Sequence, residues 1–208
     1  HVTVNAAGQT DLQAALGLVR QSPLAALTSH ALDSAKAQGS AQIAFDLELP
    51  IAQLDKTRVR GRVGFRSNAL QFNPEAPQLQ QLQGAVQFHD QGFELVNVHG
   101  QTLGGNFKME GGMASARQGV RLLARGVATS AGLQKDGNVP LLAQIAAHAV
   151  GQSAYTVEVT ASQGAQKVQV RSDLRGMALS LPPPLDKPVD EAVALNVVQS
   201  LNAQHLQE

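Results

Sequence analysis

Apolar and polar residues alternate with a period of two along most of the middle of this chain. In the segment 42–49, Ile43, Phe45 and Leu47 fall on one side and Asp46 falls on the other. This period is typical of a β-strand with one buried face and one solvated face. The alternating segments lie at 42–49, 58–66, 70–72, 84–89, 93–99, 106–111, 119–127, 155–161, 166–172 and 177–181. Turn residues separate them every ~8–12 residues, which predicts antiparallel strands.

Two other stretches have the period of a helix. Residues 11–38 place Leu12 and Leu16 at helical spacing and predict a bent pair of short helices. Residues 140–150 predict a further helix, and 130–135 a short helical turn. The sequence therefore predicts a mainly β, α+β fold.

The predicted elements form one β-rich domain over residues 1–188, with strands between about 42 and 181. Residues 189–208 have weak helical character and are interpreted as a tail or a linker to the next segment. The three prolines that follow Leu181 cannot donate sheet hydrogen bonds, so they are expected to end the last strand.

The amino-acid composition of the chain excludes several classes of function. The 208 residues have a net charge of zero, so no global attraction for nucleic acid is expected, and nucleic acid is not a predicted partner. The chain has no cysteine, which excludes disulfides and thiol chemistry but leaves the compartment open. No apolar run approaches the ~18–20 residues that span a bilayer. Because the chain begins with His1, we expect it to be a piece of a longer protein.

Four arginines share one face of the strand predicted at 58–66. They are Arg58, Arg60, Arg62 and Arg66. Such a stripe could contact an anionic headgroup or a phosphate. The favoured alternative is a solvated strand face, because an antiparallel pairing would set Asp46 and Glu48 opposite Arg60 or Arg62.

The polar residues form no catalytic pattern. The six histidines lack the spacing of metal ligands, and no Gly-x-Ser-x-Gly nucleophile motif occurs. The glycines at 104–105 lead into a strand, so they make no phosphate-binding loop. We therefore predict no metal, no cofactor and no enzymatic activity; a hydrolase on a β-rich fold stays the third alternative.

Several stretches together resemble the YhdP family, the long AsmA-like envelope proteins of Gram-negative bacteria. The matching pieces are Ser22-Pro-Leu24, Gly39 with Phe45-Asp-Leu-Glu-Leu-Pro50, Val59-Arg-Gly61, Gly84-Ala-Val-Gln-Phe88, Gly100-Gln-Thr-Leu-Gly-Gly105, and Ser172-Asp-Leu-Arg-Gly176 continuing to Leu181-Pro-Pro-Pro-Leu-Asp-Lys187. In order and spacing they cover roughly residues 20–190.

The resemblance implies an elongated, curved antiparallel sheet whose apolar concave face is partly covered by short helices. It also implies a periplasmic segment of a protein that an N-terminal helix outside this chain anchors in the inner membrane. Such proteins are similar to bridge-like lipid-transfer proteins and are associated with moving phospholipid toward the outer membrane. The expected partners are phospholipid or fatty acyl chains and neighbouring segments of the same long chain.

Apolar positions on alternating strands are the candidates for lining a lipid groove. They are Ile43, Phe45, Leu47, Val63, Phe65, Phe88, Phe107, Met109 and Leu122. The alternative for each is an ordinary core position beneath a helix. In that case the chain would be a closed structural or protein-interaction module of the cell envelope, with no lipid bound.

Overall fold

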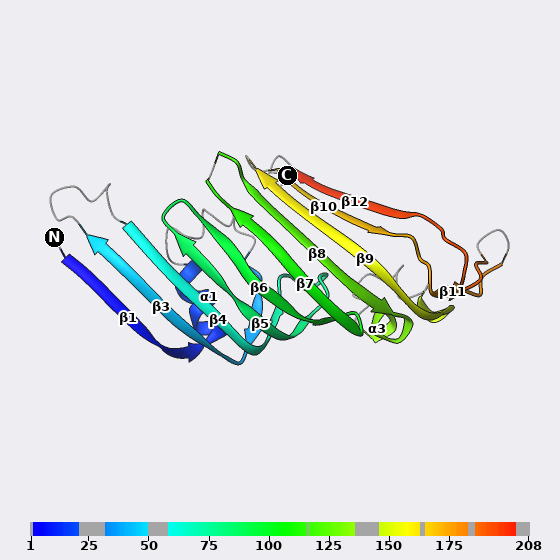
Figure 1. Cartoon of the computed structure of the whole chain (residues 1–208), viewed down its shortest axis with the longest axis horizontal. Helices are drawn as coiled ribbons and strands as arrows, with labels where there is room; N and C mark the ends of the chain where they lie inside the picture. Colours follow the sequence, from blue (N-terminus) through cyan, green and yellow to red (C-terminus); the bar gives the residue numbers. More distant parts are fainter. Residues whose placement is uncertain are drawn as a thin grey trace, which may run out of the picture.

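The computed structural model of the chain describes residues 2–20, 32–49, 58–115, 117–135, 146–162, 165–182 and 186–202. In this part of the chain, twelve strands form one elongated antiparallel sheet (Figure 1). The strands are β1 (Val2–Asp11), β2 (Lys36–Gln38), β3 (Ser40–Leu49), β4 (Arg58–Gln71), β5 (Leu79–His89), β6 (Gly92–Thr102), β7 (Gly105–Met113), β8 (Val120–Thr129), β9 (Ala149–Ser162), β10 (Ala165–Ser172), β11 (Met177–Leu179) and β12 (Leu195–Asn202). The helices among the described residues are α1 (Leu12–Arg20) and α3 (Ser130–Lys135).

Neighbours in the sheet are mostly neighbours in sequence. The order is β1-β3-β4-β5-β6-β7-β8-β9-β10-β12, with β2 paired to β4 and β11 paired to β9. Every pairing among the described strands is antiparallel, and this order describes an open sheet. The prediction of a mainly β, curved antiparallel sheet with a few short helices is confirmed.

The strand registers give the sheet one apolar and one polar face. Across β7, β8, β9, β10 and β12 one register row consists of Met109, Ala124, Val157, Val170 and Val197. The adjacent row, which points to the other face, consists of Lys108, Arg125, Thr156, Arg171 and Asn196. Because side chains of successive residues alternate between faces, this pattern makes the whole sheet amphipathic.

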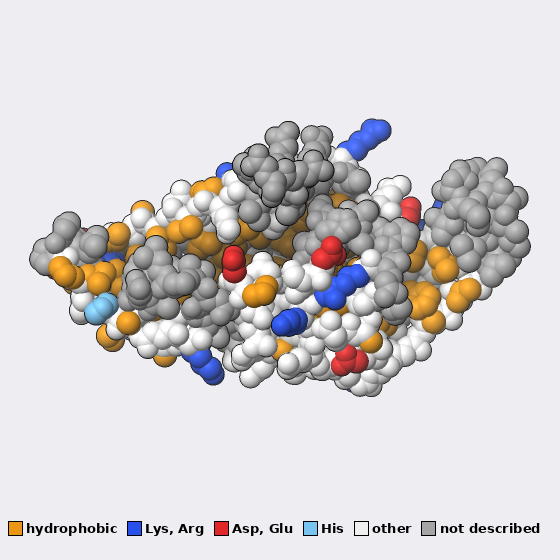
Figure 2. Space-filling view, turned by 180° about the vertical axis from the view of Figure 1, so that it is seen from behind, with side chains coloured by type: hydrophobic (Ala, Val, Ile, Leu, Met, Phe, Trp, Pro, Cys, Tyr) orange, Lys and Arg blue, Asp and Glu red, His pale blue; other side chains and the backbone are white. Residues whose placement is uncertain are grey.

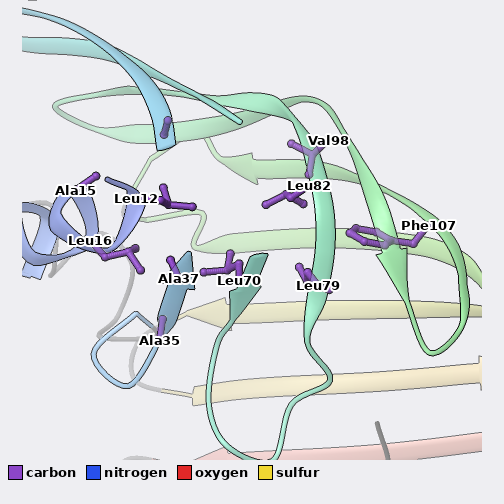
Figure 3. Packing of buried hydrophobic residues seen from close by; sticks show 11 residues of the cluster. Leu12, Ala15, Leu16, Ala35, Ala37, Leu70, Leu79, Leu82, Val98 and Phe107 are labelled. Atoms are coloured by element: carbon purple, nitrogen blue, oxygen red, sulfur yellow. The ribbon is translucent and has the colours of Figure 1, made fainter. Parts of the chain in front are cut away.

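Helix α1 packs on the apolar face at one end of the strands. Asp11 caps it, since its Oδ1 accepts hydrogen bonds from the backbone N–H of Gln13 at 2.8 Å and of Ala14 at 3.2 Å. The cluster that α1 shares with β2 to β7 is shown in Figure 3. Its buried members are Leu12, Ala15, Leu16, Ala35, Ala37, Ala41, Leu70, Leu79, Leu82, Val98 and Phe107. The hydrophobic core therefore occupies part of the apolar face and does not extend along all of it.

A line of left-handed backbone positions crosses the sheet from β2 to β7. It includes Gly39 (φ 91°), Ser67 (φ 59°), Gln81 (φ 49°), Asn97 (φ 51°) and Gly111 (φ 111°). Register shifts occur beside the members in β4, β5 and β6. Bulges bend strands and increase their twist, so a row of them on neighbouring strands accounts for the curvature of the sheet.

The side chain of Asn68 holds the backbone in place at the turn between β2 and β3, within this line of left-handed positions. Its side chain is fully buried. Its Nδ2 donates to the backbone oxygens of Gln38 at 3.2 Å and Ser40 at 3.1 Å, and its Oδ1 accepts from the Arg66 N–H at 2.7 Å. A Cβ on Gly39 would lie 3.0 Å from this Nδ2, which explains the glycine between the two carbonyls.

Four features differ from the sequence predictions. The helix predicted over 11–38 is confirmed for α1, but residues 36–38 form β2, and residues 21–31 lie outside the described part. The small side chain of Ala37 lets β2 pack beneath α1, and the Ala37 N–H donates to Gln13 Oε1 at 2.7 Å. Tertiary contacts thus override local helical spacing there.

The other three differences concern the segment before β9 and the two ends of the chain. Of the helix predicted over 140–150, residues 146–147 are helical, but its end is wrong because β9 already begins at Ala149; residues 140–145 lie outside the described part. The segment predicted as a tail contains β12, which pairs with β10 over eight residues. Apolar Leu195 and Val197 alternate with Asn196 there, so the period is that of a strand. The edge strand β1 was not predicted at all.

Candidate functional site

All nine groove candidates lie on one face of the sheet. Strand registers place Ile43 beside Val63, and Phe45 beside Gly61, which in turn neighbours Phe88. The same face continues through β7 and β8. Phe107 is buried in the cluster beside α1, whereas the other eight candidates are only partly buried.

The partly buried apolar positions of this face form a continuous band, which we call the apolar floor. Its members are Ile43, Phe45, Leu47, Val59, Val63, Phe65, Val86, Phe88, Phe93, Leu95, Met109, Leu122, Ala124, Val157, Val159, Val168 and Val170. Figure 2 shows hydrophobic side chains gathered along the long axis of a hollowed face. The floor therefore runs across the strands. The eight strands that carry it, β3 to β10, lie side by side, and at ~4.8 Å per neighbour they span about 34 Å.

The described helices flank the floor on one side. Helix α1 packs near the start of β3 and the end of β4, and α3 follows the end of β8. In an antiparallel sheet these strand ends lie on the same side. The helices therefore cover the face near those ends and leave the floor between them and the opposite ends of the strands.

Three aromatic rings lie across glycines of the preceding strand on this face. The pairs are Phe88 over Gly61, Phe107 over Gly100 and Tyr155 over Gly126. A Cβ on Gly61 would lie 2.3 Å from Phe88 Cζ, and one on Gly126 would lie 2.7 Å from Tyr155 Oη. Because the glycines leave room, the rings lie flat along the sheet and keep the floor smooth.

Tyr155 is the polar exception among these rings. Burial raises the pKa of its hydroxyl from 10.0 to about 12, because the ionised form would lose hydration. The phenol is neutral at physiological pH, as it would be without this shift, and can donate a hydrogen bond. Sequence alternation did not single out Tyr155, although it lies two residues before Val157 on the same face of β9.

The arginine stripe lies on the opposite face. Arg60 is the register neighbour of Asp46, as expected from the sequence, and Arg58 is the neighbour of Glu48. Arg62 and Arg66 continue the same polar face. The sheet thus separates these guanidinium groups from the floor, and contact with an anionic headgroup stays a prediction.

Other kinds of site were sought in the described residues. No three of their His, Asp and Glu side chains lie close enough together to hold a metal ion. None of the described helices is long and apolar enough to cross a membrane. A cavity of ≈ 360 Å³ lies beside β2, lined by polar residues such as Gln13 and Gln71, and includes none of the predicted site residues.

Comparison with known proteins identifies the family. The family described as YhdP protein matches residues 1–208, which is the whole chain. No curated protein and no solved structure matches. Together with the open antiparallel sheet, the full-length match shows that this chain belongs to the YhdP family.

Proposed function

We propose that this chain is a non-catalytic segment of an envelope protein and that it carries phospholipid acyl chains along the apolar floor. The observation that supports this most directly is the floor itself. It is continuous over the eight strands β3 to β10, lies on one face only, and is only partly buried, while the opposite face is polar. Extended apolar patches are rare on proteins that bind nothing apolar.

The energetics favour an acyl chain as the occupant. Burial contributes ~0.8 kcal/mol per CH₂, so complete burial of about sixteen carbons would yield roughly 12 kcal/mol. A chain lying on an open floor buries about half of its surface, which leaves roughly 6 kcal/mol by the same scale. Aliphatic side chains offer no fixed polar anchor along most of the floor, so neighbouring positions bind the chain about equally. That suits movement along the axis of the sheet.

The proposal extends to the whole protein and its surroundings. The YhdP family is not known for enzymatic activity. We propose a periplasmic location, with an inner-membrane anchor elsewhere in the longer protein. The edge strands suit pairing with neighbouring segments: β12 has no charged residue and no proline, and β1 has one charge, at its last residue. Edges that must stay unpaired usually carry such residues.

Helix α1 covers part of the apolar face, and this favours a second candidate function for that part of the sheet. Leu12 and Leu16 are buried against Leu70 and Val98, so this end of the face is a closed core. A segment covered throughout would be a structural or protein-interaction module with no lipid bound. Measuring whether the chain binds lipid distinguishes this module from the proposed lipid carrier.

A matched pair of variants in β8 provides the test. Leu122 lies on the floor, and Leu123 lies on the polar face between Glu110 and Glu158. The purified chain is titrated with a fluorescent fatty acid, and lipid retained after mild extraction is identified by native mass spectrometry. Leu122→Gln should weaken binding about tenfold, since an unpaired amide in an apolar site costs ~1–3 kcal/mol. Leu123→Gln should leave binding unchanged. A folded wild-type chain that binds no lipid, or equal losses in the two variants, would count against the floor.

A further inference from the structure

The three flat rings on the apolar face occupy equivalent positions. Each lies on an odd-numbered strand, is the register neighbour of a glycine on the strand before it, and leans over that glycine. Two are phenylalanines, Phe88 and Phe107, and the third is Tyr155. The ring alone is therefore sufficient to cover the glycine, and the packing does not require the hydroxyl of Tyr155.

That hydroxyl lies on an otherwise apolar part of the face. Tyr155 shares its face with Val157 and Val159, and Ala124 lies on the neighbouring strand. No hydrogen bond to its Oη occurs among the described residues. Tyr155 is only partly buried, and its Oη is not among the fully buried unpaired atoms of the described residues, so the hydroxyl is accessible to a ligand.

A second hydroxyl on the same face also lacks a partner. Thr102 is 7 % exposed, and its Oγ1 makes no hydrogen bond within the described part of the chain. It lies one register row beyond Phe107, towards the helix-covered ends of the strands, in the row of Gly105. Ser153 follows Tyr155 in the same direction on β9, and its Oγ lies 3.2 Å from Ser172 Oγ. The face thus changes from apolar to hydroxyl-bearing at the row of Tyr155.

We propose that Tyr155 is the polar contact point of the floor, and that its hydroxyl donates a hydrogen bond to the acyl carbonyl oxygen of a bound lipid. The ring of Tyr155 supports the first carbons of the chain, and the rest of the chain lies on the aliphatic floor. The ligand class is an acylated lipid, either an ester or a free fatty acid. This assignment rests on the proposed function, because it requires that the floor binds acyl chains.

The test uses three probes that differ at the carbonyl. A lysophospholipid with an ester-linked chain has the acceptor, its alkyl-ether analogue of equal length and headgroup does not, and palmitate represents the free acid. Binding to the chain and to Tyr155→Phe is measured by titration calorimetry. Phenylalanine occupies the two equivalent positions, so the variant should fold, and circular dichroism verifies this. Thr156→Val removes a neighbouring hydroxyl from the polar face and is the matched control.

We expect Tyr155→Phe to bind the ester probe or palmitate about three- to tenfold more weakly, the range of one lost hydrogen bond. Its affinity for the ether probe should match that of the wild type, and Thr156→Val should bind all probes normally. If the wild type binds the probes but Tyr155→Phe binds both carbonyl-bearing probes equally well, the role of Tyr155 is overturned and the proposed function stands. A parallel loss for the ether probe would also overturn it, because ring packing would then explain the effect. If the wild type binds no probe, the proposed function fails first.

Discussion

Replacing Asn68 should reveal how strongly the bent part of the sheet depends on one side chain. The Asn68 amide makes three hydrogen bonds, to Gln38 O, to Ser40 O and from the Arg66 N–H. The side chain is fully buried, so Asn68→Ala leaves three backbone groups without these partners. Each lost bond contributes about 1 kcal/mol, and an unpaired buried group adds ~1–3 kcal/mol. We expect a loss of about 3–5 kcal/mol in the free energy of unfolding.

Asn73 supplies the matched control. Its Oδ1 accepts from the backbone N–H groups of Glu75 at 2.9 Å and Ala76 at 2.7 Å, but the turn is exposed. Water can replace the side chain there, so Asn73→Ala should cost about 1 kcal/mol or less. Urea unfolding followed by circular dichroism measures both variants. Domains of this kind are stabilised by only about 5–15 kcal/mol, so the difference will be large.

A third variant separates the donor from the acceptor role. Asn68→Asp keeps an oxygen for the Arg66 N–H but turns a second oxygen towards two carbonyl oxygens. It should be as unstable as Asn68→Ala at neutral pH and recover part of the loss when the carboxyl group is protonated. Equal midpoints for the alanine variants of Asn68 and Asn73 would refute the conclusion that burial makes these hydrogen bonds decisive.

Three further outcomes follow from the packing. Gly61→Val should lower the thermal midpoint by the equivalent of about 1–3 kcal/mol, because a Cβ there meets Phe88 Cζ at 2.3 Å; Gly64→Val, whose nearest contact is 3.7 Å away, should not. The raised pKa of Tyr155 contributes stability that is complete below pH 10 and is lost as the pH rises through about 12. Because the chain has one tyrosine, tyrosinate absorbance reports this titration directly, and the Phe variant should lack that part of the alkaline loss. Lys187→Ala should be less stable than Lys187→Met in urea, since both lose the two carbonyl hydrogen bonds of the buried Nζ but only alanine leaves a cavity.

The amphipathic sheet could be predicted from sequence because its signal is local. Strict alternation around Phe45 and Met109 defines both the strand and its buried face, without reference to any partner strand. Placing those residues on a common face then requires only that antiparallel neighbours meet in register. For this reason all nine groove candidates lie on one side of the sheet, and the arginines lie on the other.

The parts that were missed depend on distant contacts. Residues 36–38 pair with β4 because α1 and the Asn68 amide hold them there. The helical spacing of the residues around Ala35 does not indicate these contacts. The burial of Phe107 also depends on other strands, because it packs in a cluster with Leu82 and Val98. Tyr155 was missed for a different reason, since its importance derives from its position over Gly126, a residue of another strand. The aliphatic alternation of β9 was visible, but the glycine beneath the ring was not.

The proposed transport can be examined through the binding free energies expected from the floor and from Tyr155. One hydrogen bond contributes about 1 kcal/mol, which slows departure from a site roughly fivefold, since 1.4 kcal/mol corresponds to tenfold. Acyl burial on the floor contributes several times more but is nearly equal at neighbouring positions, so it holds the lipid without opposing its movement. In the proposed transport, the Tyr155 hydroxyl would therefore set a preferred position beside the apolar floor without trapping the chain. Replacing several floor residues with polar ones would create deeper minima and slow movement far more than the loss of Tyr155 would speed it.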